Sequence, residues 1–102
     1  MSQMKLAKRL VIIADVAIKG KILAQCLELG AKGYHAVVVL GKGEHEQTDD
    51  ILTGAALIRI ELVTNAEVSE AIMDYLHSGE FKHYALTAYV DNVEVDSRDH
   101  FV

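Results

Sequence analysis

The stretch YHAVVVLGKG, residues 34–43, decides the fold, because an apolar run of β-branched residues ends there at a pair of glycines. A polar segment, residues 44–50, and a second apolar run, residues 55–63, follow it. Two β-type runs joined by roughly a dozen residues predict a hairpin with a long connection, and connections of that length are usually functional or disordered. Gly41 and Gly43 permit positive φ, and with Lys42 between them they favour an anion. The connection is therefore where we expect function.

Composition limits the range of functions. The chain has 102 residues, of which 51% are apolar, so we expect one domain over residues 1–102 with a single small core. A net charge of −5, with 15 acidic against 10 basic residues, argues against nucleic-acid binding. The single cysteine, Cys26, cannot form an internal disulfide and fits a reducing compartment. No apolar run approaches the roughly 20 residues of a membrane span and no signal-peptide pattern is present, so we expect a cytoplasmic protein.

Periodicity predicts two repeats of strand, helix and strand. Helical spacing of the apolar residues predicts an amphipathic helix that begins near Ile18 and ends at Gly30. The sequence Thr64-Asn65-Ala66-Glu67 matches a capping box and predicts a second helix, which Ser78-Gly79 ends. The expected strands cover residues 10–14, 34–40, 55–63 and 84–90, and residues 92–98 form either an edge segment or a tail.

This order predicts an α+β, ferredoxin-like βαββαβ sandwich, in which two helices cover one face of a four-stranded antiparallel sheet. The other face then needs a cover. Val37, Val39, Leu57 and Leu86 supply more apolar sheet surface than two short helices can bury, so self-association is expected.

Several short motifs together resemble the PII signalling family. They are Gly30-Ala31-Lys32-Gly33-Tyr34, then Gly41-Lys42-Gly43, then Arg59-Ile60-Glu61-Leu62, and finally Ser78-Gly79-Glu80-Phe81. Each motif is weak, but their order and spacing match over about Lys8 to Arg98. The resemblance implies a homotrimer that binds an adenine nucleotide in the clefts between subunits.

The resemblance also assigns nucleotide-binding residues. Gly41 and Gly43 would form the base of the family's T-loop, with Lys42 between them. Lys82 would stand near the lysine of the B-loop, and Arg98 near a C-terminal phosphate-binding arginine. The residues beside the adenine would be Tyr34 or His35, together with Glu61.

Departures from the family pattern narrow the resemblance to one branch of the family. The B-loop shrinks to residues 78–83, and the T-loop, about residues 44–55, is short and acidic, with Glu44 where a phosphate contact is expected. These features resemble the PII-like branch associated with bicarbonate uptake and carboxysomes. That branch implies ADP or AMP, with ATP less favoured, and bicarbonate as ligands, and no catalytic cofactor. Bicarbonate would bind at residues 41–43 with Lys42 or Arg59.

Each candidate residue also has an ordinary structural interpretation. Arg59 on a strand more commonly pairs with Glu61 than with a ligand, and Lys82 and Arg98 are equally typical of surface charges. The acidic run from Glu44 to Asp50 is most often a solvated loop. No nucleophile has a recognisable base partner and no metal cage is evident, so we expect no catalysis and assign no metal site.

We therefore expect a regulatory protein that senses ADP or AMP and bicarbonate between subunits and regulates inorganic-carbon metabolism through its T-loop. Its protein partner would be a bicarbonate transporter or a carboxysome-related protein. Two alternatives stay open. One is a trimer resembling the metal-binding CutA proteins, with a divalent ion held by His45 or His83, and the other is a structural oligomerisation module.

Overall fold

One of the two central strands of the sheet is β1 (Met4–Asp15), in a computed structural model that describes residues 3–39, 56–96 and 98. Antiparallel to β1 run β4 (Leu86–Asp96) on one side and β3 (Leu57–Thr64) on the other, and β2 (His35–Val39) pairs with the outer edge of β3. The strand order is β2-β3-β1-β4. Together with two helices between the strands, this order is the predicted ferredoxin-like arrangement.

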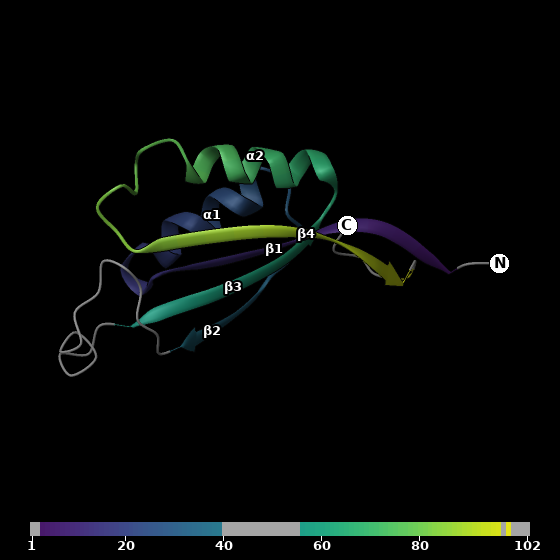
Figure 1. Cartoon of the computed structure of the whole chain (residues 1–102), viewed down its shortest axis with the longest axis horizontal. Coiled ribbons are helices and arrows are strands. Elements are labelled where there is room, and N and C mark those ends of the chain that lie inside the picture. The colour runs from purple at the N-terminus through teal and green to yellow at the C-terminus, as the bar shows by residue number, and fades with distance from the viewer. Residues whose placement is uncertain (1–2, 40–55, 97, 99–102) are drawn as a thin grey trace.

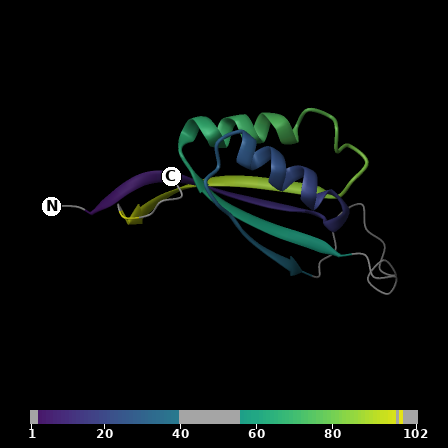
Figure 2. The same cartoon turned by 180° about the vertical axis from the view of Figure 1, so that it is seen from behind.

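Both helices lie on one face of the sheet, as Figures 1 and 2 show. A 3-10 turn, η1 (Val16–Ile18), leads into α1 (Lys19–Glu28), and α2 (Ala66–Leu76) follows β3. The predicted end of the first helix is confirmed, since Gly30 follows it with φ +120°. Neither of these described helices is long and apolar enough to span a membrane.

The start of α2 differs from the predicted capping box by one residue. Asn65 is the N-cap, and its Oδ1 accepts a hydrogen bond from the amide of Val68 at 2.8 Å. Thr64 is instead the last residue of β3, is 2% exposed, and donates its hydroxyl proton to the carbonyl of Asn65. The capping prediction from Thr64 was therefore wrong, because strand pairing with Lys8 holds Thr64 in the sheet.

The core lies between the helices and alternate residues of the two central strands. Strand side chains alternate between faces, so the partners that the register pairs share a face. The fully buried side chains of this layer are Leu10 and Ile12 of β1, Ile60 and Leu62 of β3, Ile22 and Cys26 of α1, and Ile72 of α2.

Two strands are longer than the sequence predicted. β1 extends well before residue 10, and β4 continues through the segment expected to be an edge or a tail. Beyond the end of β3, Met4–Ala7 pairs with Val93–Asp96 alone, and these two segments form a ribbon that projects past the helices (Figure 1). The prediction rested on continuous apolar runs, whereas in this ribbon charged residues interrupt the apolar ones and backbone pairing holds the two segments together.

The face of the sheet opposite the helices is uncovered in the single chain. Val37 is 55% exposed there, and the register places Leu57 and Val39 on the same face. Leu86 does not belong to this surface, because it pairs with Ala14 and packs against the core on the helix side. The open face is therefore apolar as predicted, without Leu86.

Candidate functional site

The candidate residues fall at both ends of the sheet and on both of its faces. Gly41, Lys42, Gly43 and the predicted T-loop lie outside the described residues. Lys82 lies in the connection between α2 and β4, at the end of the sheet where β4 begins. Arg98 follows β4 at the opposite end. One chain therefore does not bring Lys82 and Arg98 together.

Of the residues expected beside the adenine, His35 and Glu61 lie on the open face. His35 pairs in register with Glu61, and Tyr34, one residue before β2, is 39% exposed. Arg59 forms an ion pair with Glu61, Nη1 to Oε1, at 3.2 Å. The structural interpretation of Arg59 is thus confirmed, and any anion that it binds must compete with that carboxylate.

A second ion pair lies on the same face. The guanidinium of Arg9 donates from Nε and Nη2 to the two carboxylate oxygens of Asp91, at 3.1 and 3.0 Å. This hydrogen-bonded carboxylate raises the pKa of Arg9. With the Arg59–Glu61 pair, it places two ion pairs among the apolar side chains of this face.

The side chain of Asp96, the last residue of β4, holds Arg98 in place. Its Nε and Nη2 donate to the carboxylate of Asp96 at 3.0 and 2.6 Å, and its backbone amide donates to the same group at 2.9 Å. These bonds lower the pKa of Asp96 and raise that of Arg98. A phosphate group that binds this guanidinium must displace Asp96. Phosphate oxygens can accept from the same two planar N–H donors of Arg98 that the carboxylate now occupies.

Lys82 lines a cavity of about 330 Å³ beside the end of α2. The floor of this end cavity is apolar and consists of Leu76, Phe81 and Leu86. Its rim carries His77, Gly79, Lys82 and Tyr84. The resemblance pointed to Lys82 and to the motif that contains Gly79 and Phe81, whereas no sequence signal connected Leu76, His77, Tyr84 and Leu86 with them.

The connection at this cavity also offers backbone donors. Gly79 has φ +94°, and the amides of Gly79, Glu80 and Phe81 donate to no acceptor among the described residues. Successive free amides around a left-handed residue, close to a lysine, suit an anion. Lys21 of α1 approaches Glu80 at 3.5 Å, which ties the connection to the first helix.

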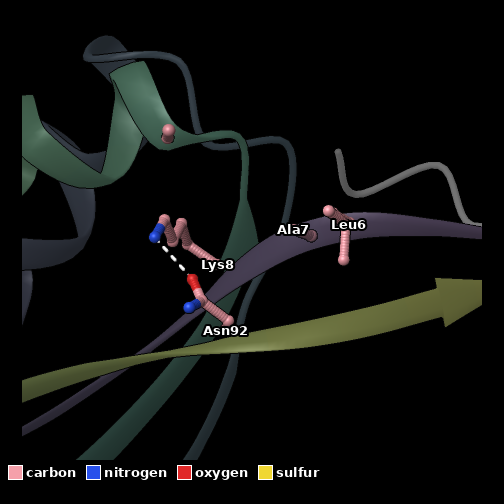
Figure 3. A pocket seen from close by; sticks show the side chains of 5 residues that line it. Leu6, Ala7, Lys8 and Asn92 are labelled. Atoms are coloured by element: carbon pink, nitrogen blue, oxygen red, sulfur yellow. Dashed lines mark hydrogen bonds between the residues drawn. The ribbon is translucent and has the colours of Figure 1, made fainter.

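A second cavity, of about 300 Å³, lies at the base of the ribbon. Leu6, Ala7, Lys8, Asn92 and Ala66, at the start of α2, line it (Figure 3). The amine of Lys8 donates to Oδ1 of Asn92 at 2.5 Å, so the cation is already engaged within the chain. We assign no ligand to this largely apolar hollow.

Metal-ligand residues do not gather in the part of the chain that the structure describes. No group of three His, Cys, Asp or Glu side chains suitable for a metal ion occurs in residues 3–39, 56–96 and 98. His83 lies in the connection after α2, whereas His45 and its acidic neighbours lie outside the described residues.

Comparisons with a family profile and with solved structures point to the same protein family. The profile of the family described as nitrogen regulatory protein P-II matches residues 7–100. No curated protein matches the chain. A structure described as a PII-like signalling protein from Thermus thermophilus is 30% identical, with a TM-score of 0.78, and the match covers 99% of this chain and 100% of that one.

Two further structures are informative. CPII from Thiomonas intermedia K12, a nitrogen regulatory PII-like protein bound to ADP, AMP and bicarbonate, is 26% identical, with a TM-score of 0.76 and coverage of 90% of this chain and 94% of that one. A Bacillus subtilis GlnK–ATP complex is 16% identical with a TM-score of 0.52 over 84% of both chains, and this likeness concerns the fold alone.

Proposed function

Because the chain belongs to the nitrogen regulatory protein P-II family, we propose that it is a PII-like sensor of ADP or AMP and of bicarbonate. The ligands bind between the subunits of a homotrimer and change what the T-loop, about residues 44–55, can contact. The observation that carries the proposal is the cationic end cavity at Lys82, in a chain that resembles a PII-like protein bound to ADP, AMP and bicarbonate.

The open face of the sheet supports self-association. Val37, Val39 and Leu57 leave apolar surface without a cover in one chain, and a surface of this kind usually marks an interface. The Arg9–Asp91 and Arg59–Glu61 pairs lie on the same face, and because both charges of each pair come from one chain, they can stay paired where the contact buries them.

The separation of the basic residues supports a site shared between subunits. Lys82 and Arg98 lie at opposite ends of one sheet, so a single nucleotide cannot reach both in one chain. In a head-to-tail ring, the ribbon end of one subunit meets the α2–β4 end of the next. Arg98 from one subunit and Lys82 from its neighbour then hold one diphosphate between them.

Bicarbonate completes the proposed ligand set. Its site is formed by Gly41, Lys42 and Gly43 at the T-loop base, with Arg59 as the alternative cation. Since Arg59 is already paired with Glu61, Lys42 and the glycine amides are the favoured contacts. The output is regulatory, and a bicarbonate transporter or a carboxysome-related protein is the proposed partner of the loop.

Titration calorimetry and thermal melting test this function. ADP or AMP should raise Tm, because a ligand at 100 times its Kd stabilises the form that binds it by about 2.7 kcal/mol. Bicarbonate should add to the shift. Lys42→Ala and Arg98→Ala should weaken nucleotide binding while the trimer stays intact by light scattering. Absence of any shift with saturating ADP and AMP would refute the proposal.

A further inference from the structure

The ribbon carries apolar surface that the helices do not reach. Strand alternation places Leu6 on the same side of β1 as Leu10, which the helices bury farther along the sheet. At the ribbon this cover stops with Ala66, the first residue of α2, and the hollow of about 300 Å³ opens there (Figure 3). Leu6 lines the hollow and is 78% exposed, and Met4 on the same side is 46% exposed. We call Met4, Leu6 and the hollow the ribbon patch, and a contiguous apolar surface of this kind usually marks a contact.

The chain turns as it leaves β4. The backbone amide of Arg98 donates to Oδ1 of Asp96 at 2.9 Å, and a bond from an aspartate to the amide two residues on forms an Asx turn. The guanidinium of Arg98 holds the same carboxylate at 3.0 and 2.6 Å, which fixes the turn further. An Asx turn bends the chain as a β-turn does, so it favours a return of the following residues along the ribbon.

The register of the ribbon sets how far such a return must reach. Glu94 pairs with Leu6, so the patch lies two residue steps, about 7 Å, back from Asp96. Residues 99–102, Asp-His-Phe-Val, lie outside the described residues and span about 13 Å when extended. A return that starts level with Asp96 brings its third residue, Phe101, level with Leu6.

From the patch, the turn and the reach we propose that residues 99–102 fold back and dock on the ribbon patch, with Phe101 against Leu6 and Val102 toward the hollow. A segment of the same chain is favoured because its short tether gives it a high effective concentration at the patch. The ribbon also gains by it, since two paired strands on their own are only marginally stable in water. The inference goes beyond the proposed function and does not depend on it.

Cross-linking tests the contact directly. The double variant Leu6→Cys with Phe101→Cys should form a disulfide within one chain under mild oxidation, because docking brings the two side chains together. Val38 of β2 is similarly exposed, at 63%, and does not line the hollow, so Val38→Cys with Phe101→Cys should form much less. Mass spectrometry identifies the joined peptides, and electrophoresis without reductant shows whether one or two chains are joined. Cys26 is fully buried and does not compete.

The rate of thiol alkylation gives a second measurement. Adding Phe101→Ser to Leu6→Cys should speed alkylation about 3- to 10-fold, a modest factor because burial of the aromatic ring is opposed by the entropy of ordering the segment. Asp96→Ala removes the Asx turn and should also speed alkylation of Leu6→Cys. In Val38→Cys, the matched control, Phe101→Ser should leave the rate unchanged. Circular dichroism checks that each variant folds.

Two results would overturn the inference. If the disulfide between residues 6 and 101 joins two chains, a neighbouring subunit covers the ribbon patch and the segment does not dock on its own chain. If Phe101→Ser leaves the alkylation of Leu6→Cys unchanged, the segment does not cover Leu6. Either result leaves the proposed nucleotide function standing, because calorimetry with ADP and AMP tests that function separately.

Discussion

Two glycines with positive φ, Gly30 and Gly79, provide a quantitative test of the structure. At Gly30, φ is +120°, and a Cβ atom would lie 3.0 Å from Cγ2 of Val68. At Gly79, φ is +94°, but nothing lies within 4 Å of the added atom. Both substitutions by alanine incur backbone strain, and only the first also meets a neighbouring side chain.

The expected magnitudes follow from this difference. Backbone strain of this kind costs about 1–3 kcal/mol, which sets the expected loss for Gly79→Ala. The close contact with Val68 adds about 1–3 kcal/mol, the usual cost of overpacking, so Gly30→Ala should lose roughly twice as much. For a domain of this size each kcal/mol corresponds to about 4–8 °C in Tm. Gly20 has no close neighbour and lies in α1, so Gly20→Ala should instead stabilise by about 0.5–1 kcal/mol.

Urea unfolding followed by circular dichroism measures all three variants, at one protein concentration because association shifts apparent stability. A double variant, Gly30→Ala with Val68→Ala, removes the contacting methyl groups and should recover part of the loss relative to the sum of the single changes. Equal losses for Gly30→Ala and Gly79→Ala, or no coupling between residues 30 and 68, would show that the packing of α2 against the end of α1 is misplaced.

Three other perturbations address the open face, the Arg98 fork and the buried thiol. Val37→Asp places a charge on the open face and should dissociate the trimer while leaving folded subunits, which light scattering and circular dichroism can establish; an unchanged mass would contradict the proposed interface. Asp96→Asn removes the carboxylate that holds the guanidinium of Arg98. Because those charge-assisted bonds stabilise only the protein without bound phosphate, ADP binding should strengthen about 3- to 10-fold in calorimetry. Weaker binding would argue against a phosphate role for Arg98. Burial raises the pKa of the Cys26 thiol from 9.0 to about 11. Because the thiol of the unfolded chain then loses its proton at lower pH than that of the folded chain, the free energy of unfolding should fall as pH rises from 9 to 11. The slope should be at most about 1.4 kcal/mol per pH unit. Cys26→Ala should remove that part of the slope, and an identical slope in the variant would show that the thiol is not buried.

The sequence alone was sufficient for features set by local pattern. Helical spacing located the first helix and the motif at residues 64–67 the second, and Gly30 marked the end of the first one because only a glycine takes φ +120° without strain. The repeated order of strand, helix and strand gave the fold class, and the motifs around the glycines pointed to the family that the profile match then established.

Other features depended on partners distant in the chain. The ribbon forms because Met4–Ala7 and Val93–Asp96 pair with each other, although neither segment has the apolar pattern of a buried strand. Pairing also kept Thr64 in β3 and moved the helix cap to Asn65. Leu86 faces the core and not the open face because the register sets it opposite Ala14.

The residues of the candidate site also divide into those that the sequence indicated and those that only the tertiary structure brought together. Lys82 was a candidate from the resemblance to the family's B-loop, but the cavity that it lines was not predicted. His77, Tyr84 and the apolar floor lie at the end of α2, in a turn and on β4, and only packing of α2 over the sheet brings them around one space. Sequence pattern records which residues share a face of one element, whereas a cavity depends on how separate elements are placed, and that placement is fixed only when the whole core is packed.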